Sequence, residues 1–285
     1  RQHSEWHTNI LCAILDMSFD DGRFPRLYDA RKKIAQQFDK GDVIEYIRES
    51  RRISNPSDRI RYMTDCTELE REEIVRLIVD AGEIPASIEN VYPALWNYWR
   101  RFSFSGGEFS GVLTKYFQDY KRQKLLGRIE PSFMEALRDF AEDRPQFALP
   151  TRESVLEGIA ADGIALCWID ALGCEFLGFI QSFAERLGLK LKVTPVRVKL
   201  PSITSFNRSF YDEWQGDKMP PVSRLDKIKH GAFEKSYEPS TDAPTELPHE
   251  LIVVEESINA IAMRLRKKPG SKVVLTSDHG ATRLA

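Results

Sequence analysis

The sequence predicts an α/β fold preceded by a helical region. Residues 163–169 form a continuous apolar run, which is typical of a parallel strand buried on both faces. A strand, a helix and a second strand then follow one another over 163–199, as at the start of a doubly wound sheet. Residues 1–150 instead show apolar residues at helical spacing. We therefore divide the chain into a helical domain, 1–150, and an α/β core, 151–285.

In the helical region, apolar residues spaced three and four apart predict a first helix over 5–17. Thr67 begins a capping box for another helix, which Gly82 closes, and Pro131 starts a further one. The basic run 121–124 is predicted to be a solvated helix end.

Three features of the helical region resemble sites but have plainer interpretations. The aromatic run 96–101 could stack nucleic-acid bases, yet aromatics at helical spacing usually belong to a core. The glycines of 103–107 lack the spacing of a phosphate loop and predict a turn. His3 and His7 lie one helical turn apart without an evident third ligand, so we expect them at the surface.

In the α/β region, Thr151 caps a short helix that ends near 158, and the strand 163–169 follows. A helix over 176–187 leads to residues 190–199, whose alternating pattern predicts a second strand. Pro195 favours a position near the sheet edge for that strand.

A hydroxyl-rich loop, 200–208, follows the second predicted strand. Residues 216–248 are rich in Pro, Ser, Asp and Lys and predict a long irregular excursion or a small insertion. A helix over 248–268 and a strand over 272–276 complete the pattern.

Polar residues come where these strands end. Asp170 follows the first strand, Ser202 and Thr204 lie in the loop after the second, and Asp278 and His279 follow the last. The carboxyl ends of parallel strands meet at one sheet edge, where sites are built. Two carboxylates, an imidazole and a hydroxyl suit Zn²⁺ or Mn²⁺, which would activate the hydroxyl as a nucleophile. The alternative is that Asp-His-Gly is only a polar turn.

Composition narrows the class of protein. With 285 residues, 42% of them hydrophobic, the chain can bury a sizeable core, and a net charge of −2 without a basic block gives no sign of nucleic-acid binding. Four cysteines without CxxC spacing predict reduced thiols and a cytoplasmic protein. No apolar run reaches the roughly 18 residues of a membrane span. A start without Met and an end just after Asp-His-Gly suggest a fragment with sequence missing on both sides.

Three motifs carry a resemblance to a known family. They are Trp168-Ile-Asp170-Ala-Leu172, Leu200-Pro-Ser-Ile-Thr204 and Val274-Leu-Thr-Ser-Asp278-His279-Gly280. In this order they resemble the PglZ branch of the alkaline phosphatase superfamily, from bacteriophage exclusion (BREX) systems. The run 174–180 and the ending 281–285 look most like the type 4 subtype. The resemblance covers 151–285.

The resemblance implies an alkaline-phosphatase-like three-layer core with a doubly wound, mostly parallel sheet, incomplete in this chain. It implies that Asp170, Asp278 and His279 bind a divalent metal, Zn or Mn, and that Thr204 is its fourth ligand and the catalytic nucleophile. Ser202 is the rival nucleophile.

Members of this family usually hold a second metal with an Asp and two His. His230, His249 and Asp242 are the candidates here, but none shows the expected Asp-to-His spacing. One metal site is therefore visible, and we expect the remaining His of a second site beyond Ala285.

The function implied is a metal-dependent phosphoester hydrolase of a bacterial anti-phage defence complex. Its partners would be other defence-system proteins and a phosphoester substrate, with nucleic acid and nucleotides among the candidates, and no membrane. The alternative is a non-catalytic scaffold subunit with a partial metal site.

Overall fold

The computed structural model describes residues 9–105, 107–159, 161–230 and 243–280. These residues form two compact units. The first comprises described residues within 1–96, 125–127 and 235–248, and the second those within 97–124, 128–234 and 249–285. The domain division expected at residue 150 stays a prediction.

The first unit is built of short helices around α5 (Glu68–Ala81). As predicted, the hydroxyl of Thr67 accepts a hydrogen bond from the backbone N–H of Glu70, and Gly82 ends the helix in the left-handed region at φ 67°. The Glu70 carboxylate accepts from the Thr67 hydroxyl at 3.0 Å and not from the Thr67 backbone N–H, so only half of the predicted capping box forms. The buried Glu70 carboxylate pairs with Arg31 at 2.6 Å. The other elements of this unit are η1 (Ala13–Asp16), α2 (Phe24–Ile34), η2 (Ala35–Gln37), α3 (Lys40–Ser50), α4 (Pro56–Ile60) and α6 (Ile88–Val91).

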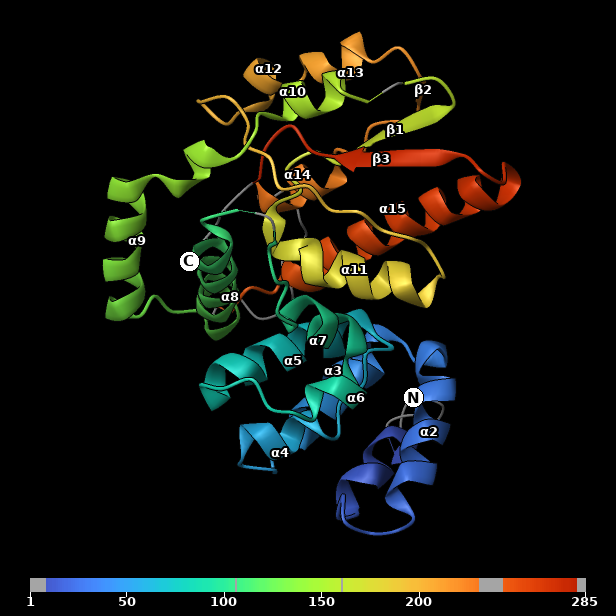
Figure 1. Ribbon diagram of the computed structural model, residues 1–285. Helices are drawn as coiled ribbons and strands as arrows, with labels where there is room; N and C mark the ends of the chain where they lie inside the picture. The colour runs from blue at the N-terminus through green and yellow to red at the C-terminus, as the bar shows by residue number, and fades with distance from the viewer. Residues whose placement is uncertain (1–8, 106, 160, 231–242, 281–285) are drawn as a thin grey trace. The chain divides into compact units, whose positions relative to one another are not determined.

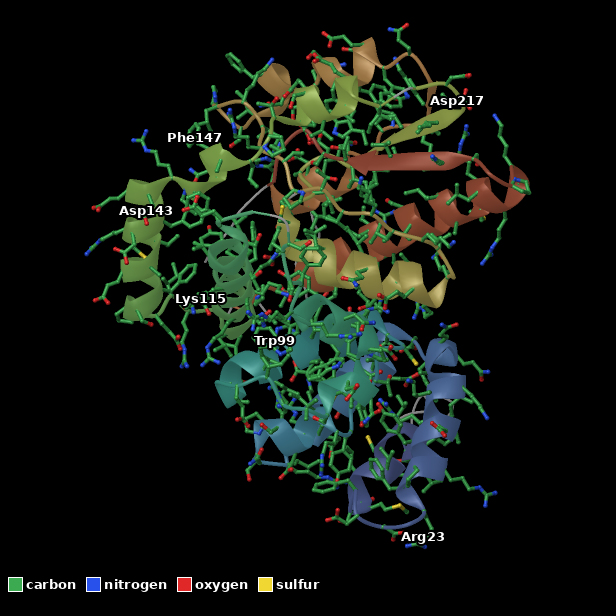
Figure 2. All side chains as sticks on the ribbon, viewed as in Figure 1. Arg23, Trp99, Lys115, Asp143, Phe147 and Asp217 are labelled. Carbon is green, nitrogen blue, oxygen red and sulfur yellow. The ribbon has the colours of Figure 1, made fainter. Side chains whose placement is uncertain are left out.

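The second unit contains a parallel sheet of three strands in the order β2-β1-β3. β1 (Ile164–Trp168) lies in the centre, β3 (Lys272–Thr276) on one side and the two-residue β2 (Asp217–Lys218) on the other. Asp217, labelled in Figure 2, marks the exposed strand β2. Parallel pairing confirms the α/β class that the apolar run predicts.

Helices lie on both faces of this sheet (Figure 1). On one face are α10 (Arg152–Glu157), α12 (Thr204–Asn207) and α13 (Ser209–Glu213), and on the other are α11 (Leu177–Arg186) and α15 (Leu247–Lys267). The first face is held by a buried cluster of Leu166, Trp168, Phe210 and Trp214. The remaining helices include α7 (Pro93–Trp99), α8 (Ser110–Leu126), α9 (Pro131–Asp143), η3 (Pro145–Ala148) and η4 (Cys174–Phe176).

Two predictions about this region are wrong. Residues 190–199 do not join the sheet; Arg197 forms a single bridge with Thr151 instead. Pro195 lacks an N–H, and the edge of β1 is taken by β2 and by Val222, which bridges Ile169. The excursion predicted over 216–248 contains β2 and the helix α14 (Arg224–Lys229), although residues 231–242 lie outside the described chain.

The basic run 121–124 is also not the solvated helix end that its charge predicts. Lys121 is 2% exposed, and its ammonium donates to the carbonyls of Tyr98, Trp99 and Arg100. Those carbonyls lie at the C-terminal end of α7, where backbone acceptors lack helical donors. Lys124 is buried in an ion pair with Glu250 at 2.8 Å.

Each of the four cysteines is a free thiol, as predicted. In the part of the chain that the structure describes, every helix is too short or too polar to cross a bilayer.

Candidate metal centre

The first half of the site is the turn that follows β1. The backbone N–H of Asp170 still donates to the carbonyl of Val222, at 3.0 Å, which continues the sheet by one residue. Ala171 then takes a left-handed conformation with φ 61°, which turns the chain sharply away from the strand. Asp170 is therefore left at the carboxyl end of β1, with 9% of its surface exposed.

The second half is the turn that follows β3. Asp278 is completely buried, and its Oδ1 accepts hydrogen bonds from Trp168 Nε1 at 3.1 Å and from the Ala171 N–H at 3.3 Å. Its Oδ2 has no hydrogen-bond partner and lies 3.3 Å from His279 Nε2. One oxygen of this carboxylate is thus fixed by donors, and the other is left for a further ligand.

The two turns touch because glycines lie between them. A Cβ added to Gly280 would lie 3.1 Å from the Cα of Gly173, a distance that few side chains tolerate. The glycine of the Asp-His-Gly motif therefore permits close approach of the two ligand-bearing turns. The second turn is also held by the buried guanidinium of Arg152, which donates to the carbonyls of Ser277 and Asp278 at 2.8 and 3.1 Å.

Thr204, the first residue of α12, reaches the same point from the hydroxyl-rich segment 200–208. Its Oγ1 lies 3.2 Å from His279 Nε2 and 3.5 Å from Asp170 Oδ1. Asn207, fully buried, holds the loop by donating to the carbonyls of three residues, Lys199, Pro201 and Ile203, and by accepting from the Lys199 N–H. The hydroxyl is therefore presented by a fixed loop.

The spacing of these atoms fits a tetrahedral cation. Zn²⁺ binds oxygen and nitrogen at about 2.0–2.1 Å, so adjacent ligand atoms at tetrahedral angles lie about 3.3–3.4 Å apart. Observed separations are 3.2 Å (Thr204 to His279), 3.3 Å (His279 to Asp278), 3.5 Å (Thr204 to Asp170) and 3.6 Å (His279 to Asp170). Ligand atoms of Asp170, Asp278 and His279 all lie within 4.8 Å of one another. With the unpartnered Asp278 Oδ2, the residues present fit a divalent metal.

Electrostatics point the same way. Burial, with repulsion from Asp278 and Asp226, raises the pKa of Asp170 to about 7. Burial also acts to raise the pKa of Asp278, but Thr204, Trp168 and His279 together lower it. In the absence of a cation, the proton of this carboxylate pair therefore resides mainly on Asp170. Two buried carboxylates this close need a cation if both are to ionise.

Helix α14 supplies Asp226, which the sequence reasoning missed, and it is capped by His230, which was predicted as a candidate ligand of a second metal. Repulsion from Asp226 contributes to the raised pKa of Asp170. Asp226 Oδ1 is buried without a hydrogen bond and lies 3.3 Å from Nε2 of the exposed His230. An Asp and a His four positions apart share one helical face, and this spacing was the overlooked signal.

The other predicted candidates are placed as follows. Ser202, in the loop with Thr204, is exposed. His249 lies in the first turn of α15 and is not among the described residues that cluster with Asp170. Asp242, His3 and His7 lie outside the described residues.

Comparison with known proteins gives one match. Residues 1–80 match the model of a domain of unknown function (DUF7863), which ends far before the first metal-site residue. Neither curated proteins nor solved structures give a match to the chain. The case for function therefore depends on the site and on the sequence motifs.

Proposed function

We propose that this protein is a metal-dependent phosphoester hydrolase of the PglZ kind, with an alkaline-phosphatase-like core, acting in a cytoplasmic anti-phage defence complex. One observation carries the proposal. The hydroxyl of Thr204 lies 3.2 Å from His279 Nε2 and 3.5 Å from Asp170 Oδ1, in the group where Asp278 keeps an unpartnered oxygen. A hydroxyl among metal ligands is the arrangement that an activated nucleophile requires.

Each residue has a chemical task in this proposal. Asp170, Asp278 and His279 would hold a Zn²⁺ or Mn²⁺ ion, with Thr204 as the fourth ligand. When bound, the cation would favour the ionised hydroxyl and offset negative charge on the phosphoryl oxygens.

The reaction then needs two displacements. Thr204 Oγ1 attacks phosphorus, forming a Thr–O–P bond while the bond to the leaving alcohol breaks. Water next cleaves the Thr–O–P bond, which releases phosphate or a phosphomonoester and restores the hydroxyl. The loop held by Asn207 keeps the nucleophile in place through both steps.

In this proposal Asp226 and His230 are the candidate ligands of a second cation. The family that the motifs resemble uses an Asp and two His for this purpose, and Asp226 of α14 lies 3.3 Å from His230, the residue that follows this helix. Candidate substrates are phosphomonoesters, phosphodiesters, nucleotides and nucleic acid, and candidate partners are other proteins of the defence system.

The test compares two hydroxyls of one loop. Thr204→Ala should reduce Zn²⁺- or Mn²⁺-dependent hydrolysis of p-nitrophenyl phosphate and bis(p-nitrophenyl) phosphate on the order of a thousandfold, because the nucleophile is lost. Ser202→Ala, at an exposed position of the same loop, should keep wild-type rates.

The reverse pattern would make Ser202 the nucleophile. Undiminished activity in both variants and in Asp278→Ala would contradict the proposal. A chain that binds neither Zn²⁺ nor Mn²⁺ in excess would instead favour the scaffold role.

A further inference from the structure

A buried lysine contacts the turn that carries Asp170. Lys229, the last residue of α14, is 6% exposed. Its ammonium donates to the carbonyl of Ala171 at 2.9 Å and lies 3.2 Å from Glu175 Oε1. It also lies 5.1 Å from the centre of the Phe176 ring. The Lys229 ammonium thus joins α14 to both ends of the turn that carries Asp170.

Burying this ammonium is costly unless it is compensated, and the surrounding charges provide the compensation. Glu175 is 4% exposed and pairs with Lys229. Deeper in the unit, Glu250 is 1% exposed and pairs with Lys124. Burial acts to raise the pKa of Glu250, but Lys124 and also Lys229 lower it. A buried network of alternating basic and acidic groups therefore comprises Lys124, Glu250, Lys229 and Glu175. Lys229 is the member of this network that contacts the turn carrying Asp170.

The turn itself needs support. Ala171 is a non-glycine residue in the left-handed region, a backbone conformation that is unfavourable for a residue with a Cβ. Its two backbone polar groups are both held: the N–H by Asp278 Oδ1 and the carbonyl by Lys229. The same peptide segment therefore connects a metal-ligand carboxylate to the buried ammonium.

Glu175, the partner of Lys229, restricts which residue can occupy position 173. A Cβ added to Gly173 would lie 1.9 Å from a carboxylate oxygen of Glu175, so only glycine allows this placement. Gly173 is also the residue that Gly280 approaches. Moving Glu175 would therefore disturb the contact between the two ligand-bearing turns.

We infer that Lys229 is a positioning residue for the metal centre: through the carbonyl of Ala171 it fixes the turn that presents Asp170 and that donates to Asp278. The inference rests on the proposed metal-dependent function.

If the Lys229 ammonium is removed, its positioning role and its charge repulsion predict opposite changes in metal affinity. An ammonium repels a divalent cation, so removing it should tighten metal binding if Lys229 acts only as a charge. If Lys229 positions the turn, removing it should weaken binding despite the lost repulsion. Loss of a supporting contact of this kind typically costs 10–100-fold in metal affinity.

The experiment uses the full chain and competition between protein and a chromophoric chelator for Zn²⁺ and for Mn²⁺. Lys229→Met should bind metal at least about tenfold more weakly than wild type. Lys227→Met, at an exposed position of the same helix, should match wild type.

A second pair of variants separates positioning from loss of stability. Lys229→Met leaves Glu175 buried without its cation, which can weaken folding by itself. Lys229→Met/Glu175→Gln removes that charge, and its parent for comparison is Glu175→Gln, which keeps the contact between Lys229 and Ala171. We expect the double variant to recover melting temperature but to remain about tenfold weaker in metal binding than its parent.

Equal affinities of the double variant and its parent would overturn the inference, and so would tighter binding by Lys229→Met. In either case the wild type still binds metal, and the proposed function stands. If the wild type binds neither metal, the proposed function and the inference fall together.

Discussion

The carboxylate pair of the metal centre should make the metal-free protein less stable as pH rises. Asp170 has a pKa of about 7 in the folded protein, against about 3.9 in an unfolded chain. Between these values the folded state binds more protons than the unfolded state. The stability associated with protonated Asp170 is therefore complete below about pH 4 and is lost as pH rises through about 7.

The size of the effect follows from the shift. A difference of about three pKa units corresponds to up to about 4 kcal/mol, and about 3 kcal/mol of it falls between pH 5 and 8. Asp170 is 9% exposed, so solvent screens little of it. Bound metal should reverse the trend, because the cation binds ionised Asp170 and competes with its proton.

The assay is urea unfolding from pH 5 to 8, with a chelator and then with saturating Zn²⁺. Subtracting the free energy of unfolding of Asp170→Asn from that of wild type removes the contribution of titrating groups that do not interact with Asp170. In chelator this difference should fall by about 3 kcal/mol as pH rises. Asp162→Asn, which alters an exposed carboxylate, should leave the wild-type curve unchanged. A wild-type minus Asp170→Asn difference that stays flat across this range would refute the reasoning.

Two further predictions concern the support of Asp278. Trp168→Phe removes the indole N–H that donates to Asp278 Oδ1 at 3.1 Å. This change should weaken Zn²⁺ binding about 10–100-fold in chelator competition while the protein stays folded. Unchanged affinity would contradict this role of Trp168. Gly280→Ala places a Cβ 3.1 Å from the Cα of Gly173 and should lower both metal affinity and the melting temperature, by the equivalent of about 1 kcal/mol. Gly111→Ala, which meets no atom within 4 Å, should leave metal affinity unchanged, and the idea fails if the two alanines behave alike.

The ends of the two main strands could be read from the sequence. Their apolar runs are long enough to mark β1 and β3, and a polar residue where such a run stops lies at the carboxyl edge by geometry alone. Asp170, Asp278 and His279 were predicted in this way, and the structure brings them together with Thr204. The chemical roles of these residues remain predictions.

Other features depend on partners that are distant in sequence. Residues 190–199 have a strand-like pattern, but pairing was decided by competition for the edge of β1, which Asp217–Lys218 occupies. Lys121 and Lys229 look like solvated charges because the carbonyls that bury them come from other elements. Local pattern carries no information about such partners.

The register of β1 and β3 has a consequence for folding kinetics. The two strands pair with Trp168 opposite Thr276, and beyond this pair the Ala171 N–H donates to Asp278, 107 positions away in sequence. A slip of one residue would move one ligand set to the wrong face of the sheet. The cation can therefore be held only after this long-range pairing has formed in the correct register. Pairings of this kind form slowly, so metal should retard unfolding much more than it accelerates folding.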